Sequence, residues 1–198
     1  MKTSDSLSHT QALLIIDMQN DGIVMVPPAR SAIPCISHVA NFYRDKNFPV
    51  LYKTRIHRAN GVDVEKFRIE LFNDTPFLVK GTYGAEIVEE LKPLDGEIVV
   101  EGTRFSGFFQ TDLHIVLTRL GVKTLVICGG QTPNCIRATV TDALAYDYNV
   151  ILLSDATVAQ TTEIHLANLL DMKNMGVEIM TSDELLHSIT CRQANRDA

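Results

Sequence analysis

One cysteine follows a strand-like run at the point where a helix is expected to begin. Residues 123–128 (KTLVIC) lead through two glycines into 131–137 (QTPNCIR), which places Cys135 in the first turn of a predicted helix. Free backbone N–H groups and the helix dipole lower the pKa of a thiol at such a position and favour the thiolate. The pattern predicts a nucleophilic Cys135. The alternative is a buried structural cysteine, as most free cysteines are.

An acidic residue ends a second apolar run. Residues 12–16 (ALLII) are continuously apolar, which is typical of a strand covered on both faces, and Asp17 follows them directly. Ligands bind beyond the carboxyl ends of the strands in an open α/β sheet. We therefore expect Asp17 and Cys135 to share one crevice. The alternative is that Asp17 only forms the turn after the strand.

Strand and helix patterns alternate along the whole chain. Strands are predicted at 12–17, 50–55, 98–100, 124–129, 149–155 and 177–181, and helices at 29–46, 85–91, 111–120, 133–147, 162–175 and 183–188. This alternation predicts an α/β fold, a three-layer sandwich around a doubly wound, mostly parallel, Rossmann-like sheet of six strands. Residues 1–198 are expected to form a single domain with a flexible N-terminus at 1–11. The segment 56–82 has no clear element and is the expected lid or oligomer contact.

The composition favours a compact enzyme that acts on small molecules. A chain of 198 residues that is 45% hydrophobic can fill one core, and a net charge of −6 argues against nucleic acid or an anionic membrane as a partner. The four cysteines lack C-x-x-C spacing, which favours free thiols in the cytoplasm. No secretory or membrane-spanning run is present in the sequence. The six histidines show no metal-ligand spacing, so we expect neither a metal nor another cofactor.

Four segments resemble the signature segments of the isochorismatase-like cysteine hydrolases, in the order and spacing of that family. They are 15–21 (IIDMQND), 79–86 (VKGTYGAE), 104–113 (RFSGFFQTDL) and 132–139 (TPNCIRAT), and the likeness extends over residues 12–181. The resemblance implies hydrolysis of a C–N bond in a small amide, carbamoyl or ureido compound, with Cys135 forming a thioester and Asp17 acting as the base. It also implies a cis peptide between Gly130 and Gln131, an oxyanion hole formed by the N–H groups of Gln131 and Cys135, and a homodimer or homotetramer.

The third member of the family's Asp–Lys–Cys triad is missing from its expected position. That position, two residues before Arg104, is occupied by Gly102. Arg104 and Lys80 are candidate replacements, but a solvated cation is the simpler interpretation of both. A glycine that requires positive φ is a further explanation of Gly102. Losing such a charge costs about 2–4 kcal/mol, roughly thirty- to a thousandfold in rate, so we expect low activity and a gain when lysine is restored at this position.

The substrate contacts and the function remain open at this stage. Candidate substrate-binding residues are Gln19, Arg55, His57, Lys80 and Arg104. Nicotinamidases of the family carry an Asp-x-His metal site after the second strand. Residues 55–63 (RIHRANGVD) lack this motif, which argues against nicotinamide as the substrate and against a required metal. A cysteine hydrolase is the preferred function. The alternatives are an impaired relative that keeps a binding pocket, and a structural oligomer subunit.

Overall fold

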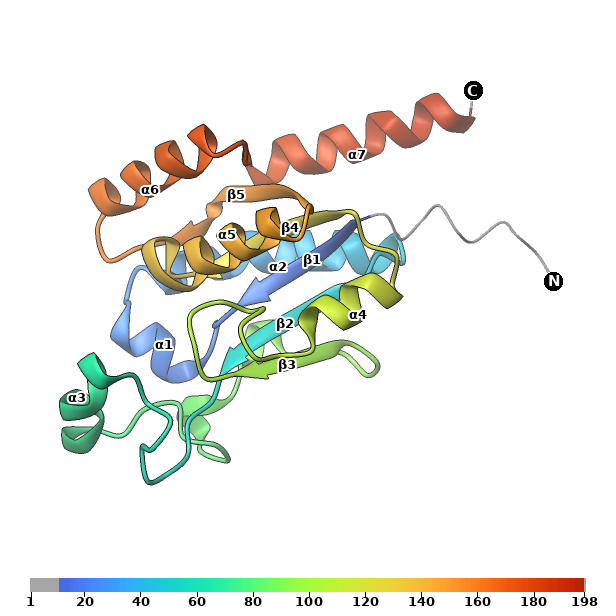
Figure 1. Ribbon diagram of the computed structural model, residues 1–198. Coiled ribbons are helices and arrows are strands. Elements are labelled where there is room, and N and C mark those ends of the chain that lie inside the picture. Colours follow the sequence, from blue (N-terminus) through green and yellow to red (C-terminus); the bar gives the residue numbers. More distant parts are fainter. Residues whose placement is uncertain (1–10, 198) are drawn as a thin grey trace.

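Short apolar runs form a six-stranded sheet in the computed structural model, which describes residues 11–197 (Figure 1). The strands are β1 (Gln11–Ile16), β2 (Val50–Arg55), β3 (Ile98–Gly102), β4 (Thr124–Gly130), β5 (Asn149–Val158) and β6 (Glu178–Met180). Their order is β3-β2-β1-β4-β5-β6, and every neighbouring pair is parallel. The predicted α/β sheet is thus confirmed. Gln11 already belongs to β1, and the rest of the expected N-terminal segment lies outside the described residues.

Helices cover both faces of this sheet and complete the three layers. The helices are α1 (Asn20–Met25), α2 (Ala29–Asp45), α3 (Ile69–Asp74), α4 (Leu113–Arg119), α5 (Arg137–Ala145), α6 (Thr162–Asn174) and α7 (Ser182–Asp197). One buried cluster joins α2 and α7 to the sheet, and a second joins α4, α5 and α6 to the opposite face. Within the described residues, no helix is long and apolar enough to cross a membrane.

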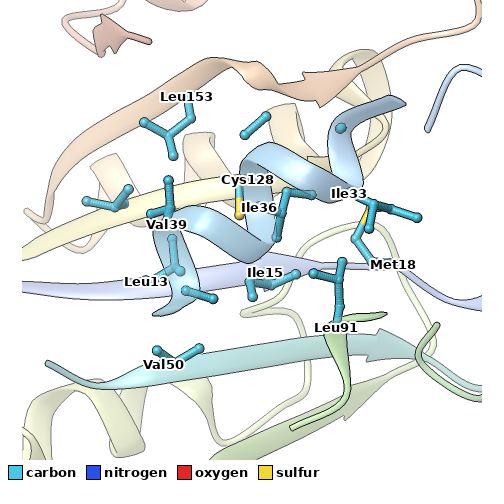
Figure 2. Close-up of a cluster of buried hydrophobic side chains, with 14 of the residues drawn as sticks. Leu13, Ile15, Met18, Ile33, Ile36, Val39, Val50, Leu91, Cys128 and Leu153 are labelled. Carbon is cyan, nitrogen blue, oxygen red and sulfur yellow. The ribbon is translucent and has the colours of Figure 1, made fainter. Parts of the chain in front are cut away.

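Successive side chains of β1 alternate between the two faces of the sheet and are buried on both, which fixes the position of the strand. Leu13 and Ile15 pack in the cluster under α2, whose Ile36 is fully buried there (Figure 2). Leu14 and Ile16 point to the other face and pack in the second cluster. Full burial of a side chain of this size contributes about 1.5–3 kcal/mol. The two apolar faces thereby determine where the strand ends and where Asp17 must lie.

The strand order reverses between β1 and β4. From this pair, β2 and β3 extend to one side and β5 and β6 to the other. Ligands bind at such a switch point, beyond the carboxyl ends of the strands. The arrowheads of β1 and β2 in Figure 1 point toward the end of the molecule where α1 and α3 lie.

The connection before β3 differs from the sequence prediction. Residues 85–91 were expected to be helical but form two separate 3₁₀ turns, Tyr83–Ala85 and Glu89–Leu91. The intervening backbone pairs instead with the segment after β1, because Asn20 N–H donates to Glu86 O and Val88 N–H donates to Met18 O. The segment 56–82 also contains α3 and a 3₁₀ turn at Lys66–Arg68. The last helix extends to Asp197, well beyond the predicted end at 188.

Candidate active site

Asp17 and Cys135 lie together at the switch point of the sheet. Asp17 follows β1 with a φ of 52°, a conformation that aspartate tolerates better than most residues. Cys135 lies in a π-helical turn, Thr132–Ile136, between β4 and α5. The two side chains line the same pocket, and the Asp17 carboxylate is close enough to the thiol to raise its pKa. The pocket encloses about 530 Å³ of space, part of which is open to solvent.

The backbones that carry these two residues approach each other closely. Gly129 has a φ of 112°, and a Cβ atom at this position would lie only 2.2 Å from the carbonyl oxygen of Ile16. Only glycine satisfies both conditions. The ends of β1 and β4 therefore meet directly, without side chains between them, and this contact fixes the separation of the carboxylate from the thiol.

Apolar side chains and two arginines make up much of the pocket wall. Its remaining lining residues are Met18, Gly22, Met25, Val26, Ala29, Arg55, Arg68, Leu78, Gly130, Gln131 and Asn134. Met25 belongs to α1, so this short helix contributes an apolar side chain to the wall. The two arginines are the cations of the lining.

A buried lysine from the neighbouring strand contacts Asp17. The Nζ atom of Lys53, in β2, lies 2.9 Å from Oδ1 and 3.2 Å from Oδ2 of Asp17, and it also donates to the carbonyl oxygen of Arg104 at 3.1 Å. The Lys53 side chain is fully buried. Its ammonium group therefore uses its three donors on these acceptors. Asp17 thus lies between an ammonium group and a thiol.

Lys53 occupies the space that a lysine at Gly102 would enter. A Cβ atom at Gly102 would lie 3.7 Å from Cε of Lys53 and 3.2 Å from Cγ2 of Thr111. Gly102 is not among the positive-φ glycines, so the suggestion that it requires positive φ is wrong. A lysine ammonium group does contact Asp17, but it belongs to Lys53 on β2, whereas position 102 on β3 is a glycine.

The electrostatics of Cys135 differ from the sequence prediction. Burial, followed by the negative charge of Asp17, raises the pKa of the Cys135 thiol to about 12, although the positive charges of Lys53 and Arg55 oppose this shift. The helix dipole was expected to lower this pKa. Desolvation outweighs it, because burial removes the water that would stabilise a thiolate. At neutral pH the Cys135 side chain is therefore a thiol beside the Asp17 carboxylate.

Alkylation of Cys135 by iodoacetamide is expected to be slow at pH 8 and to rise about tenfold per pH unit up to pH 10 without a plateau. The Asp17→Asn substitution should accelerate alkylation at pH 8, because Asp17 raises the thiol pKa. The Lys53→Met substitution should slow it, because Lys53 lowers that pKa. Peptide mapping by mass spectrometry measures both, with the exposed Cys191 as the internal reference. A plateau below pH 8.5 would show that Cys135 is a stable thiolate after all.

The turn before Cys135 contains the cis peptide that the resemblance implies. The peptide bond between Gly130 and Gln131 is cis. Thr139 of α5 holds the next turn in place, because its hydroxyl donates to the carbonyl oxygen of Cys135 at 2.7 Å and accepts from Gly107 N–H at 2.9 Å. The loop after β3 is thereby tied to the turn that carries the thiol.

Of the five candidate substrate-binding residues, only Arg55 lines this pocket. Gln19 is buried, and its side-chain amide bonds to backbone atoms of Arg55 and Ala85. His57 and Lys80 line a separate hollow. Lys80 is paired there with Glu101, and the Arg104 guanidinium donates to the carbonyl oxygens of Asp63 and Thr103.

The buried His57 differs from a metal-binding histidine. Burial lowers the pKa of its imidazole, and neither ring nitrogen has a hydrogen-bond partner. The nearest carboxylate oxygen is that of Asp63, 3.5 Å from Nδ1. Within residues 11–197, no group of three histidine, cysteine or acidic side chains has the arrangement of a metal site.

Lys53 and Arg68 were not predicted as site residues from the sequence. The signal for Lys53 was present, because a lysine in the middle of a strand covered on both faces requires a buried partner. The signal for Arg68 was absent, because it lies in the stretch 56–82, where no periodic pattern identified an element.

Comparisons with known proteins agree with this architecture. The isochorismatase domain matches residues 11–184. An Arabidopsis thaliana protein named "Probable inactive nicotinamidase" is 45% identical over 182 residues, which cover 87% of this chain and 93% of that protein. The structure of an isochorismatase family protein from Desulfovibrio vulgaris superposes with a TM-score of 0.88 at 41% identity, covering 92% of this chain and 99% of that one.

A third relative has a named activity. The structure of N-carbamoylsarcosine amidase from Thermoplasma acidophilum superposes with a TM-score of 0.77 at 27% identity, covering 88% of this chain and 97% of that one. The domain match and these two structures extend over nearly all of the described residues. On this basis, the chain belongs to the isochorismatase family of hydrolases.

Proposed function

We propose that this protein hydrolyses the C–N bond of a small amide, carbamoyl or ureido compound through a thioester on Cys135. The observation that carries the proposal is that the Asp17 carboxylate lines the pocket together with the Cys135 thiol and is held there by the Lys53 ammonium. A carboxylate in that position can accept the proton of the thiol and return it. Family membership supports a hydrolase of this kind.

The first half of the reaction forms the thioester. As Sγ of Cys135 attacks the carbonyl carbon, its proton moves to Asp17 and the carbonyl oxygen becomes an oxyanion. The N–H groups of Gln131 and Cys135 are the proposed donors to this oxyanion. The C–N bond then breaks, the leaving nitrogen takes the proton from Asp17, and ammonia or an amine departs.

Water completes the cycle. It attacks the thioester and gives its proton to Asp17, and the carbonyl oxygen again becomes an oxyanion. The C–S bond breaks, the acid leaves, and Cys135 regains its proton. Lys53 does not line the pocket and is assigned as a positioning residue. It keeps the carboxylate in place and compensates its charge while the proton moves.

The second candidate is an impaired relative that binds its ligand without turnover. The name of the Arabidopsis thaliana relative and the raised pKa of Cys135 favour it. Lys53 argues against it, because the cation whose absence would impair the site is supplied from β2.

The two functions are separated by incubating the protein with a panel of small amides, carbamoyl and ureido compounds. The expected results are released ammonia or amine and a mass increase on Cys135, located by peptide mapping after an acid quench. The Cys191→Ser variant is the matched control, because this exposed cysteine lies outside the pocket and its loss should leave the adduct in place. Ligand binding without any adduct or product would favour the impaired relative.

A further inference from the structure

Arg68 is a cation on the pocket wall whose charge is not matched by a carboxylate. Within the described residues, its guanidinium takes part in no ion pair and in no side-chain hydrogen bond. The other two cations near the thiol are paired, Lys53 with Asp17 and Arg55 with Glu65. The site therefore carries one positive charge in excess.

Aromatic rings hold this guanidinium in position. Its Cζ atom lies 5.4 Å from the ring centroid of Phe67, 5.3 Å from that of Phe105 and 6.0 Å from that of Phe77. Stacking on aromatic faces orients the plane of an arginine while its N–H groups remain available to a ligand. Arg68 is thus preorganised in the wall of the pocket that contains Cys135.

A second arginine in the same wall has an unsatisfied donor. Arg55 is 2% exposed, and its Nη2 donates to Glu65 Oε1 at 2.9 Å, but its buried Nε has no partner. Its guanidinium also stacks on Phe105, 4.4 Å from the ring centroid. Buried polar groups are nearly always hydrogen-bonded, so an unpaired N–H beside a pocket indicates a place for an acceptor from the ligand.

We infer that the substrate carries a carboxylate, which Arg68 binds at the pocket wall with support from Arg55 while the amide carbonyl lies at Cys135. A planar carboxylate matches the fork of a guanidinium and neutralises the excess charge. This inference rests on the proposed function, because it names the substrate class of the same site.

The test uses pairs of substrates that differ only in the anionic group. Succinamate is compared with butyramide, and N-carbamoylglycine with hydroxyethylurea, by the ammonia they release. The parent protein is expected to prefer the anionic member of each pair by at least roughly tenfold in kcat/KM. The Arg68→Met variant should lose about ten- to a hundredfold on the anionic members, mainly through KM, while its activity on the neutral members stays within about twofold.

Two further variants make the result specific. Arg68→Lys keeps the charge and should recover part of the preference. Arg119→Met removes an exposed arginine from the last turn of α4, outside the pocket, and should behave like the parent protein. Equal losses of Arg68→Met on both members of a pair would indicate a structural role and overturn the inference, as would a parent protein without preference.

Binding separates this inference from the proposed function. Calorimetry with succinamate and butyramide does not require turnover. Selective binding of succinamate that is lost in Arg68→Met supports the inference even if no compound releases ammonia, in which case only the hydrolase proposal fails. Equal binding of the two compounds, or binding of neither, would overturn the inference.

Discussion

Asparagine in place of Asp17 is expected to lower kcat/KM for ammonia release by about a hundred- to ten-thousandfold, the usual contribution of a positioned general base. The amide cannot accept the proton of a thiol whose pKa is raised to about 12. Steady-state kinetics on the best substrate of the panel measure the loss. The same variant should alkylate faster at Cys135, so loss of turnover accompanied by a gain in thiol reactivity excludes simple unfolding.

The losses of activity caused by the Asp17 and Cys135 substitutions should not be additive. Cys135→Ser is expected to lose at least as much activity, and the double variant should be no slower than the slower single variant, because in the proposed reaction the two groups act in one step. Asp45→Asn, an exposed change at the end of α2, is the matched control. A protein that keeps more than about a third of its activity without the Asp17 carboxylate would contradict this role.

Methionine in place of Lys53 is expected to reduce kcat/KM by roughly thirty- to a thousandfold, which corresponds to the loss of one well-placed charge of about 2–4 kcal/mol. Methionine keeps much of the buried length of the side chain but leaves the Asp17 carboxylate without its ammonium partner. Thermal unfolding of the variant checks that it folds. Lys123→Met, an exposed change just before β4, is the control.

Moving the lysine from one strand to the next is the stronger test. In the Lys53→Met background, Gly102→Lys is expected to restore part of the activity, because the two side chains converge on the same space. In the parent protein the same substitution should give no gain, since Lys53 already occupies that space and Thr111 would lie 3.2 Å from the new Cβ. A marked gain in the parent would show that Lys53 does not supply the charge.

The sequence was sufficient to predict that Asp17 and Cys135 lie close together at one edge of the sheet. Both follow short apolar runs, and such runs in parallel sheets end at one edge. Burial of β1 on both faces leaves no freedom to shift these ends, so the local pattern was sufficient. The pKa of the Cys135 thiol could not be predicted from the sequence, because it depends on how much water the completed fold excludes.

Contacts between segments far apart in the sequence also could not be predicted from local sequence patterns. Residues 85–91 have helical spacing of apolar side chains, yet their backbone hydrogen-bonds with residues 18–20, which only the folded chain brings near. A lysine inside a buried strand is unusual, so Lys53 could have been recognised from the sequence. Its partner Asp17 could not, because it is 36 residues away in sequence. The residues around Arg68 show no periodic hydrophobic pattern from which its position could be predicted.

The position of Lys53 on β2 has a consequence for the motions that the site can tolerate. In the described sheet β3 is an outer strand with two exposed residues, whereas β2 is buried along its length and flanked by β1 and β3. Outer strands open more readily than central ones. A lysine at position 102 would move away from the Asp17 carboxylate whenever β3 detached from the sheet. Lys53 lies on β2 and keeps its contact with Asp17 during such openings of β3. In amide hydrogen exchange, β3 is therefore expected to exchange in openings that leave the ion pair of the site intact.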